Sequence, residues 1–433
     1  MNKTSKTNIN IITLGCSKNL VDSELLLRQL KANNITASHE SDKNSNVIVI
    51  NTCGFINDAK QESIDTILQY IEAKKAGLIE KVFVMGCLSQ RYRKELKNEI
   101  KKIDGIYGVN ELPEIVKDLG GNYNKTLVNN RYLTTPFHYA YLKIAEGCSR
   151  QCSFCAIPLI RGKYKSKPVN LIIDEAKILA EKGVKEIILI AQDLTYYGID
   201  LYKKRKLADL LRKLSEINGI DWIRLHYTYP AGFPIDVLDV MKEQDNICNY
   251  IDIPLQHISD SLLKSMRRGI SGEETLKLIN TIRNKIPDSA IRTTLIVGYP
   301  GETDQDFKDL KNFIIESKFD RLGVFTYSHE EDTPAYFLKD NIPKKIKQQR
   351  ADEIMQIQQD ISYQNNLKKV DKRFKILIDR EEENYFIGRT EYDSPEVDNE
   401  VLIEKLENSC RIGEFYNIKV IKTDMFDLYG EVY

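Results

Sequence analysis

The chain has 433 residues, about three times the length of a typical single domain, so two or three domains are expected. Its 63 Lys and Arg balance its 63 Asp and Glu, which argues against a protein that binds long nucleic acid by charge alone. No apolar stretch approaches the roughly eighteen residues that a membrane-spanning helix requires, and the composition is not that of a disordered chain. The sequence therefore predicts a soluble protein with several domains and no membrane span.

The segment 1–125 alternates short, β-branched apolar runs with helical patterns. The apolar runs cover residues 11–14, 47–50 and 82–85, and the helical patterns cover residues 20–32 and 57–75. Such alternation is typical of an α/β fold whose strands form a parallel, Rossmann-like sheet with right-handed crossovers.

Cys16, Cys53 and Cys87 each follow one of these runs, and each lies beside a glycine. Because the carboxyl ends of parallel strands meet at the edge where open α/β sheets bind ligands, the three thiols are expected to converge. Soft thiolates favour zinc, copper(I) or iron–sulfur clusters, and three of them in register favour a cluster site. An ordinary buried cysteine at each position is the simpler alternative. Cys248 and Cys410 have no cysteine neighbours and are predicted to be ordinary buried residues.

Beyond a polar connector at 126–137, strand and helix patterns alternate again over residues 138–370. The predicted strands lie near residues 139–145, 186–191, 222–227, 250–254, 291–297 and 321–327. Six such units are fewer than the eight of a closed barrel, so the segment is predicted to form a partial (β/α)₆ barrel. Its reactive loops should lie at the carboxyl ends of the strands.

The loop after the first of these strands holds Cys148, Cys152 and Cys155 in a C-xxx-C-xx-C spacing. A structural zinc site commonly needs four ligands, and neither a second cysteine pair nor a histidine lies beside this loop. An iron–sulfur cubane with three protein ligands keeps one open iron, which a catalytic site needs for a substrate or cofactor. The spacing favours such a cluster over zinc or coincidence.

The segment 371–433 changes to short strands joined by turns. They lie near residues 374–379, 384–389, 415–421 and 427–433 and predict a small all-β, OB-like barrel. The segment holds nine Lys and Arg against sixteen Asp and Glu. An acidic barrel is a poor phosphate binder and a better partner for a basic protein, although a solvated acidic surface is the alternative.

The three-cysteine loop has the spacing of radical S-adenosylmethionine (SAM) enzymes, and the whole chain resembles the methylthiotransferases among them, which end in a TRAM barrel. Within that family the sequence is most similar to the branch that modifies an aspartate of the decoding-centre ribosomal protein of the small subunit. The relatives that act on tRNA usually show Gly-Cys-Gln-Met-Asn at the first cysteine. The runs that carry the resemblance are residues 14–24, 51–56, 86–92, 144–148, 156–162, 392–398 and 427–430.

The resemblance implies two [4Fe–4S] clusters, and SAM both as methyl donor and as radical source. The auxiliary cluster would be bound by Cys16, Cys53 and Cys87, and the radical SAM cluster by Cys148, Cys152 and Cys155. One SAM would methylate a sulfur species on the auxiliary cluster. The radical from a second SAM would remove hydrogen from the aspartate β-carbon, which would then take the methylthio group.

Five residues are candidates for SAM binding by their position. They are Phe154 before the last cysteine of the loop, Gln192 and Asp193 after the second barrel strand, Gln256 after the fourth and Gly298 after the fifth. The turn from Gly298 to Gly301 is equally consistent with an ordinary turn at the barrel top, and His257 with a polar core residue. No general base is assigned, because a radical abstraction does not require one.

The expected partners are the ribosomal protein, free or in the ribosome, and a flavodoxin- or ferredoxin-type electron donor. Two oxygen-labile clusters predict a cytoplasmic protein with reduced thiols, and we expect a monomer. Two alternatives differ in class. Methylthiolation of a tRNA adenosine predicts a basic terminal barrel, and a non-enzymatic iron–sulfur scaffold predicts no cleavage of SAM.

Overall fold

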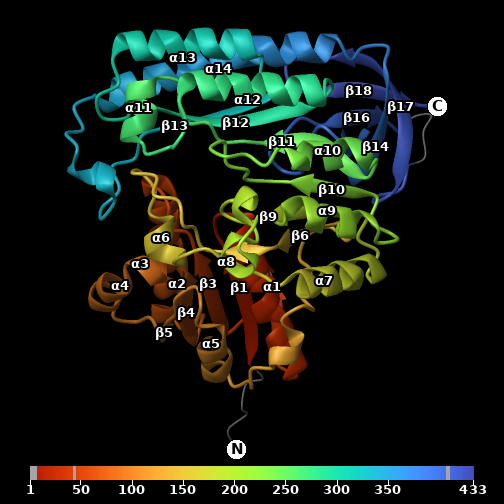
Figure 1. Ribbon diagram of the computed structural model, residues 1–433. Coiled ribbons are helices and arrows are strands. Elements are labelled where there is room, and N and C mark those ends of the chain that lie inside the picture. Colours follow the sequence, from red (N-terminus) through yellow and green to blue (C-terminus); the bar gives the residue numbers. More distant parts are fainter. Residues whose placement is uncertain (1–6, 42–44, 406–409) are drawn as a thin grey trace, which may run out of the picture. The chain divides into compact units, whose positions relative to one another are not determined.

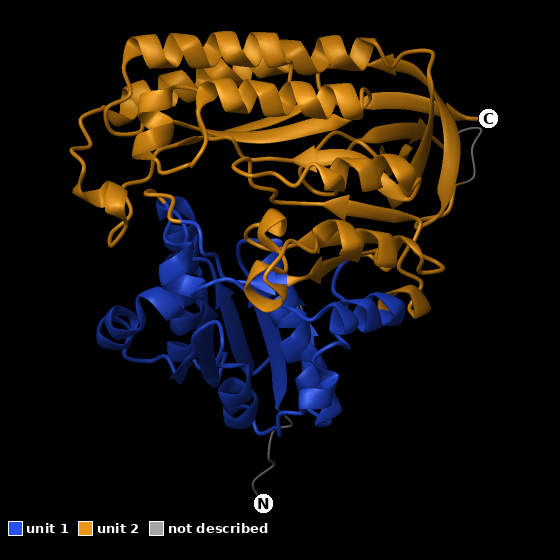
Figure 2. Cartoon of the chain, in the orientation of Figure 1, with its two compact units in different colours: residues 1–135, 145–150, 155–178 blue, residues 136–144, 151–154, 179–433 orange. Residues whose placement is uncertain are grey.

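The computed structural model describes residues 7–41, 45–405 and 410–433 (Figure 1). The chain divides into two compact units, shown in Figure 2. Unit 1 comprises residues 1–135, 145–150 and 155–178, and unit 2 comprises residues 136–144, 151–154 and 179–433. Within the described ranges, no helix combines the length and the apolar character needed to cross a membrane. The division into segments ending at residues 125, 137 and 370 stays a prediction.

Unit 1 contains a five-stranded parallel sheet with the order β2-β1-β3-β4-β5. The strands are β1 (Asn8–Thr13), β2 (Thr36–His39), β3 (Val47–Thr52), β4 (Lys81–Gly86) and β5 (Gly105–Ile106). This sheet confirms the predicted Rossmann-like fold. The sequence analysis missed β2 and β5, because a polar run of four residues and a pair of residues are too short to show a period.

Helices cover both faces of this sheet. They are α1 (Ser17–Ala32), α2 (Asn57–Lys75), α3 (Cys87–Arg91), α4 (Arg93–Glu99) and α5 (Leu112–Asp118). Val47 and Val49 of β3 belong to the core that α1 and α5 complete, whereas Ile48 and Ile50 belong to the core under α2 and α4. Alternate side chains of a strand point to opposite faces, so a strand buried on both faces is apolar at successive positions. Unit 1 also holds the short elements η1 (Lys125–Leu127), β7 (Ala145–Glu146), α6 (Ile157–Arg161) and β8 (Lys165–Ser166).

Unit 2 contains a six-stranded parallel sheet with the order β13-β12-β11-β10-β9-β6. The strands are β6 (Tyr139–Lys143), β9 (Glu186–Ile190), β10 (Trp222–Leu225), β11 (Ile247–Asp252), β12 (Ala290–Val297) and β13 (Arg321–Thr326). The first and last strands of the sheet, β6 and β13, do not pair, so the sheet is open. This arrangement confirms the predicted partial barrel and places each of its six strands within a few residues of the expected position.

The helices of unit 2 connect these strands. They are α8 (Ile199–Tyr202), α9 (Leu207–Ser215), α10 (Asp236–Glu243), α11 (Asp260–Ser265), α12 (Gly272–Lys285), α13 (Asp304–Ser317) and α14 (Lys344–Leu367), with the 3₁₀ turns η2 (Leu194–Tyr196) and η3 (Pro334–Phe337). Helix α7 (Val169–Glu181) begins in unit 1 and ends in unit 2. Helices α12 and α13 begin with capping boxes at Ser271 and Thr303, which satisfy backbone amides that a helix start leaves unpaired.

The chain ends in a closed barrel with the order β14-β15-β16-β18-β17, which confirms the predicted OB-like domain. Its strands are β14 (Arg373–Glu381), β15 (Tyr385–Thr390), β16 (Val401–Glu404), β17 (Phe415–Thr423) and β18 (Leu428–Val432). Its core is apolar and includes Cys410, while Cys248 is buried on β11 of the six-stranded sheet, so both isolated cysteines are buried as predicted. The sequence analysis missed β16, whose four residues give too little alternation to detect.

Buried ion pairs join this barrel to the six-stranded sheet within unit 2. Arg389 of β15 pairs with Glu186 of β9, and its Nε lies 2.8 Å from an oxygen of Asp379. Arg224 of β10 also pairs with Glu186, at 2.7 Å between Nε and Oε1. The loop after β15 adds contacts from Asp393, Ser394, Glu396 and Asp398 to Arg321, His226, Tyr139 and Arg292, respectively. Such pairs hold well only when both partners are present, because a lone buried charge is costly.

Candidate functional site

Unit 1 places the three dispersed cysteines at one edge of its sheet. Cys16 follows β1, Cys53 follows β3 and Cys87 follows β4, three strands that are neighbours in the sheet. A Cβ built on Gly15 would lie 3.0 Å from the Cys53 sulfur, so the loop carrying Cys16 runs against Cys53. The Cys16 and Cys53 thiols in turn both act electrostatically on Cys87. The structure therefore brings together the three residues predicted to bind the auxiliary cluster, and that role stays a prediction.

Asn19 ties the loops of these cysteines to one another. Its Nδ2 donates to the carbonyl oxygens of Leu14 at 2.8 Å and Thr52 at 3.1 Å, which lie in the loops that carry Cys16 and Cys53. Its Oδ1 lies 3.5 Å from the sulfur of Cys87 and accepts from that thiol. Asn19 is fully buried, and a buried amide with this many partners holds the surrounding backbone in one arrangement.

Ser63 of α2 fixes the loop of Cys53 from the other side. Its hydroxyl accepts from the Cys53 amide at 3.0 Å and donates to the Cys53 carbonyl at 3.0 Å. Both main-chain groups of Cys53 are thus satisfied by one buried side chain. Helix α2 therefore positions Cys53, although that residue precedes the helix in the chain.

Arg161 brings a positive charge to the same cluster of cysteines. It is buried at the end of α6, and its Nη2 donates to Asn19 Oδ1 at 2.7 Å and pairs with Asp22 at 3.2 Å. Its Nη1 pairs with Glu146 at 2.8 Å. The sequence analysis included this arginine only within the run 156–162 and gave it no role. Its approach to Asn19 is a tertiary contact over 142 residues, which no local pattern reveals.

The three thiols have different acidities. Desolvation works against ionisation of Cys16. The positive charges of Lys18 and Arg161, together with hydrogen bonds from the backbone amides of Asn19 and Lys18, outweigh it and hold the pKa of that thiol below its ordinary value. Burial raises the pKa of Cys53, and it raises the pKa of Cys87 to about 12. A thiol must lose its proton to bind a metal, so metal binding at Cys53 and Cys87 is expected to release protons.

Two glycines beside the cysteines are required by their surroundings. Gly86 has φ +102°, and a Cβ there would lie 2.3 Å from Asn51 Oδ1. Gly54 leaves room for Leu88, whose Cα would lie 2.7 Å from a Cβ at position 54. The loops can therefore pass close to one another only because these positions carry no side chain.

Three thiols are a donor set that suits an iron–sulfur cluster. Among the residues that the structure describes, no group of three His, Cys, Asp or Glu side chains is arranged to hold one metal ion. Each thiolate of a cubane binds a different iron, so the three sulfurs need not reach one atom. Thiolates are the usual ligands of such clusters, and the nearby guanidinium of Arg161 would offset the negative charge that a thiolate-bound cluster carries.

The loop of the second cysteine set is shared between the two units. Cys148 and Cys155 belong to unit 1, and Cys152 belongs to unit 2. In unit 1, the amide of Cys148 donates to the Gly162 carbonyl at 3.0 Å, and its sulfur accepts from the Arg150 amide at 3.4 Å. In unit 2, the sulfur of Cys152 lies 3.4 Å from the Tyr229 hydroxyl and accepts from Arg268 Nη1 at 3.3 Å.

Tyr229 and Arg268 form a pair around Cys152 that the sequence analysis missed. The Arg268 guanidinium lies 4.3 Å from the centre of the Tyr229 ring, and the Tyr229 hydroxyl donates to the Arg268 carbonyl at 2.8 Å. Both side chains are buried. Neither residue follows a cysteine motif in the sequence, so the fold alone brings them to the sulfur.

The residues predicted to contact SAM lie in unit 2 at the carboxyl ends of its strands. Gln192 and Asp193 follow β9, and Asp193 accepts from the Thr195 hydroxyl at 2.5 Å. Gln192 Oε1 is buried and accepts no hydrogen bond from a described residue, so it offers an acceptor to a ligand. Gln256 has φ +77°, and its main chain forms an added bridge to β12 through Thr294 and Ile296.

Phe154 lies in an apolar environment, whereas Gly298 lies next to charged side chains. The Phe154 ring packs on an apolar cluster that includes Met266, Tyr299 and Tyr327. Gly298 has φ +72°, its amide donates to the Glu302 carboxylate, and a Cβ there would lie 2.3 Å from Lys347 Cγ. The conformation of the turn after β12 is therefore fixed by specific contacts. Binding of SAM by Phe154 and Gly298 stays a prediction.

His257 lies fully buried beside the same turn. Its Nδ1 accepts from the Ser259 amide at 3.0 Å, and its Nε2 lies 3.8 Å from Glu302 Oε1. Neither of the two facing atoms has a hydrogen-bond partner among the described residues. The two interpretations made from the sequence, a polar core residue or an acid–base group, both remain compatible with this position.

Comparison with protein families divides the chain into three matched regions. Residues 142–314 match the Radical SAM superfamily, residues 370–432 match the TRAM domain, and residues 8–108 match an uncharacterized protein family, UPF0004. The first region includes the three-cysteine loop, and the UPF0004 region includes the three dispersed cysteines.

Two solved radical SAM structures share the fold. The methyltransferase TsrM from Kitasatospora setae, with cobalamin and a [4Fe–4S] cluster bound, has a TM-score of 0.54 at 13% identity and covers 76% of this chain and 77% of its own. OxsB, with aqua-cobalamin and SAM bound, has a TM-score of 0.51 at 12% identity and covers 82% of this chain and 56% of its own. At these identities the likeness concerns the fold alone.

Relatives of known name match the chain over almost all of its length. The ribosomal protein uS12 methylthiotransferase RimO of Cytophaga hutchinsonii is 59% identical over 99% of this chain and 98% of its own. Those of Flavobacterium johnsoniae and Phocaeicola vulgatus are 58% and 53% identical, over 98% and 99% of this chain and the same shares of their own. The chain belongs to the RimO family of ribosomal protein uS12 methylthiotransferases, within the radical SAM enzymes.

Proposed function

We propose that the protein adds a methylthio group to the β-carbon of an aspartate in ribosomal protein uS12. The observation that carries the proposal is the convergence of Cys16, Cys53 and Cys87 around Asn19, in a chain that also holds the three-cysteine loop. Reductive cleavage of SAM to a radical needs only the one cluster of the three-cysteine loop. A methylthiotransferase also needs a place for sulfur, which a second cluster site supplies.

The two sets of cysteines bind the two [4Fe–4S] clusters in this proposal. Cys16, Cys53 and Cys87 bind the auxiliary cluster, and Cys148, Cys152 and Cys155 bind the radical SAM cluster. When bound, the clusters and SAM supply the radical, the sulfur and the methyl group. The chain itself positions these groups around one substrate carbon and excludes water.

The residues around the auxiliary site hold it ready for metal. Asn19 and Ser63 fix the loops, and Arg161 supplies the positive charge that offsets thiolates. Around Cys152, the Arg268 guanidinium donates a hydrogen bond to the sulfur, and the Tyr229 hydroxyl, which donates to the Arg268 carbonyl, lies 3.4 Å from that sulfur. Hydrogen bonds to a ligating sulfur withdraw charge from the metal site and so raise its reduction potential.

The SAM site in this proposal lies at the carboxyl ends of the strands in unit 2. SAM is bound by the side-chain oxygen of Gln192, by the backbone of Gln256 with its positive φ, and by the turn at Gly298. Asp193 contributes a carboxylate, and Phe154 packs against the adenine. The binding of SAM by residues of several strand ends agrees with where barrel enzymes place their ligands.

A basic protein suits the terminal barrel better than tRNA does. Its sixteen acidic residues against nine basic ones repel a phosphate backbone and attract a ribosomal protein. A flavodoxin- or ferredoxin-type protein supplies the electrons. Oxygen-labile clusters place the enzyme in the cytoplasm, where we propose that it acts as a monomer.

A competition assay tests the proposal. Anaerobically reconstituted protein receives SAM, a strong reductant, a peptide from the aspartate loop of uS12 and unmodified tRNA, and mass spectrometry scores each substrate for a methylthio group. We expect modification of the peptide alone. Modification of tRNA alone would overturn the substrate assignment, and absence of 5′-deoxyadenosine would overturn the radical mechanism.

Metal content tests the ligand assignment independently of turnover. Replacing Cys16, Cys53 and Cys87 together by alanine should remove about half of the bound iron and leave SAM cleavage intact. Replacing Cys148, Cys152 and Cys155 should remove the other half and abolish that cleavage. Full iron content in either triple variant would refute the assignment of that cluster.

A further inference from the structure

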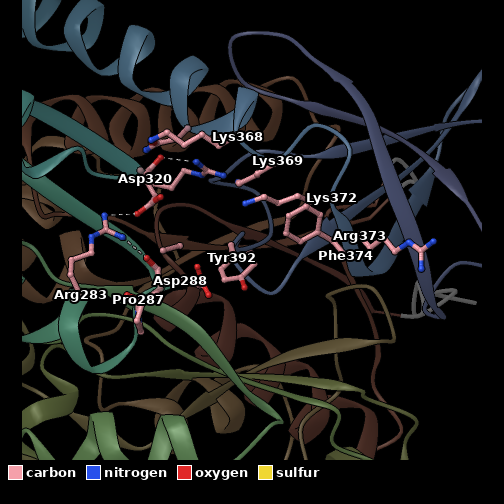
Figure 3. A pocket seen from close by; sticks show the side chains of 14 residues that line it. Arg283, Pro287, Asp288, Asp320, Lys368, Lys369, Lys372, Arg373, Phe374 and Tyr392 are labelled. Atoms are coloured by element: carbon pink, nitrogen blue, oxygen red, sulfur yellow. Dashed lines mark hydrogen bonds and ion pairs between the residues drawn. The ribbon is translucent and has the colours of Figure 1, made fainter.

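A hollow in unit 2 lies far from the strand ends that carry the predicted SAM contacts. It has a volume of about 380 Å³ and is drawn in Figure 3. Its walls come from the loop before β12, the starts of β12 and β13, the end of α14, the start of β14, and Tyr392. Ala290 begins β12 and Gly298 follows it, so the hollow and the predicted SAM turn lie at opposite ends of the same strand, about 25 Å apart.

The hollow is rich in positive charge. Its lining includes six basic side chains, which are Arg283, Arg321, Lys368, Lys369, Lys372 and Arg373. The two acidic residues of the lining are Asp288 and Asp320. Figure 3 shows Lys368, Lys369 and Lys372 on one side and Arg283, Pro287 and Asp288 on the other. This local charge is opposite to the net charge of the terminal barrel that borders it.

Ion pairs account for only two of these cations. Arg283 pairs with Asp320 at 2.8 Å, and Arg321 pairs with Asp393. Arg373 lies over the ring of Tyr433, 4.4 Å from its centre, and so turns away from the hollow. The three lysines form no ion pair with any residue in the described part of the chain. Lys368 and Lys369 contact the side-chain oxygens of Asn365 and Asn366, which carry no charge.

Two buried polar atoms of the lining find no hydrogen-bond partner in the part of the chain that the structure describes. The Ser289 hydroxyl belongs to a residue that is 1% exposed, and Arg321 Nε belongs to one that is 7% exposed. Neither atom forms a hydrogen bond to a described residue. Burial and the nearby charge of Arg321 lower the pKa of Lys369, although the carboxylates of Asp393, Asp320 and Asp398 act in the opposite direction. Buried donors without a hydrogen bond, next to lysines that form no ion pair, are features expected of an anion-binding site.

A second hollow of about 630 Å³ adjoins the first. The two share Arg283, Pro287, Asp320, Asn365 and Lys368. The second adds one basic side chain, Lys318, and one acidic side chain, Glu316, so the excess of positive charge belongs to the first hollow. Aromatic rings lie at the other end, where Phe374 and Tyr392 meet edge to face with their centres 6.2 Å apart. A base can stack on such a ring while its phosphate meets lysines.

We propose that this groove, defined by the lining of the two hollows, binds the phosphate group of a nucleotide, with Lys368, Lys369, Lys372 and the Ser289 hydroxyl as donors and Phe374 or Tyr392 against the base. The nucleotide is either free or part of an RNA strand. The proposal does not depend on the methylthiotransferase reaction, because the groove lies at the opposite ends of the strands from the predicted SAM contacts.

Fluorescence anisotropy of a 5′-labelled hexauridylate tests the proposal. The full-length protein carries its clusters and is saturated with SAM without reductant, so that the SAM site is filled. A uridine probe is chosen because the SAM site takes an adenine. We expect binding that weakens as salt is raised, and that is at least about tenfold weaker in the double variant Lys368→Glu and Lys372→Glu.

A matched pair of lysines controls for net charge. Lys277 of α12 and Lys308 of α13 are exposed and line neither hollow, so Lys277→Glu with Lys308→Glu changes the charge equally and should leave binding within about twofold. Ser289→Ala tests the buried donor without a charge change and should weaken binding while leaving the thermal midpoint unchanged. Equal losses in both double variants would overturn the site.

Competitors distinguish the two sources of phosphate. Displacement of the probe by uridine 5′-monophosphate supports a free nucleotide as ligand. Displacement by unlabelled hexauridylate alone supports an RNA strand. Equal displacement by an oligoglutamate of the same charge, or no binding of the probe at all, would overturn the proposal, because the groove would then be a general basic surface.

Discussion

Arg161 shows how one residue can matter to a site that its own sequence neighbours do not reveal. It lies on a short helix after the three-cysteine loop, yet its guanidinium contacts Asn19, which holds the loops of the dispersed cysteines. It also pairs with Asp22 and Glu146. Because these contacts are buried away from water, each of them is strong, and removing the arginine is expected to lower the stability of the fold.

Replacing Arg161 by methionine is predicted to weaken iron binding at the auxiliary site by about 10- to 100-fold, which is the usual effect of losing a residue that supports metal ligands. The variant removes the positive charge beside Cys16 and Cys87. Iron and sulfide content after anaerobic reconstitution, read with the EPR signals of the two clusters, would check this.

Arg131 provides the control, because it is also buried in unit 1 between two carboxylates, those of Glu24 and Glu175. Arg131→Met should lower stability about as much but leave iron binding by the auxiliary site unchanged. If both variants lost iron to the same extent, the effect of Arg161 would be one of stability alone.

Gly86 is the second residue at which a single change is informative. Its φ of +102° and ψ of −153° belong to a region that glycine alone occupies freely, and a Cβ would meet Asn51 Oδ1 at 2.3 Å. Gly86→Ala should therefore lower the stability of unit 1 by about 2–5 kcal/mol, as backbone strain and overpacking add. Thermal denaturation followed by circular dichroism would measure it.

Gly77→Ala separates the two causes. Gly77 also has a positive φ, of +77°, but no atom lies within 4 Å of its Cβ position. The substitution should cost about 1–2 kcal/mol, from backbone strain alone. Equal losses at the two positions would mean that the contact with Asn51 contributes nothing.

At the scale of elements, the closed barrel and the six-stranded sheet are held together by buried ion pairs and one aromatic contact. Trp222 of β10, the single tryptophan of the chain, packs edge to face on Phe415 of β17, with ring centres 4.8 Å apart. Its fluorescence therefore reports on this junction. Asp393 and Arg321 form one of the ion pairs that join the same two elements.

Asp393→Asn should lower the stability of the junction by about 3–5 kcal/mol near neutral pH, because it leaves the buried Arg321 without its counter-charge. Burial alone would raise the pKa of Asp393, but the charges of Arg321 and Lys369 outweigh burial and hold that pKa below its ordinary value of 3.8. The Trp222 emission maximum during urea denaturation of each protein would measure the difference.

The pH dependence of that difference follows from the direction of the shift. A carboxyl whose pKa is lowered by folding contributes stability above its ordinary pKa of 3.8, and the contribution is lost as pH falls through the folded value. The gap between the two proteins should be constant above about pH 5 and should close below the ordinary value. Asp352→Asn, at an exposed position of α14, should show no gap; a gap that widened in acid would contradict the assignment.

For the whole molecule, a net charge of zero hides an uneven distribution. The terminal barrel segment is acidic, whereas the groove that borders it is lined by lysines and arginines. A basic substrate protein should be drawn to the acidic surface, chiefly at low salt, because salt screens charges beyond roughly 10 Å. Glu381, the last residue of β14, forms an exposed acidic run with Glu382 and Glu383 of the turn that leads to β15.

Neutralising this run to glutamine should raise the KM for the uS12 protein several-fold at low salt, with little change in kcat and no effect at high salt. Methylthiolation rates over a salt series would show it. Glu95, Glu99 and Glu114 are exposed in unit 1, and their replacement by glutamine should leave KM unchanged. A salt-independent rise in KM would point to a packing effect instead.

The sequence by itself determined a large share of this protein, because the controlling signals are local. Apolar runs and helical periods placed β1, β3, β4 and the six strands of the partial barrel, and the C-xxx-C-xx-C spacing marked the three-cysteine loop. Strand ends in a parallel sheet lie at one edge, so the convergence of Cys16, Cys53 and Cys87 could be predicted without a structure.

Tertiary structure alone decided which residues surround those thiols and how the domains join. Arg161 meets Asn19 across 142 residues, and Arg268 meets Cys152 across 116, distances in sequence over which no pattern repeats. The basic groove is likewise assembled from α12, α14, β14 and two strand starts. Such contacts depend on how buried charges and donors find partners once the chain has folded, and periodicity carries no information about that choice.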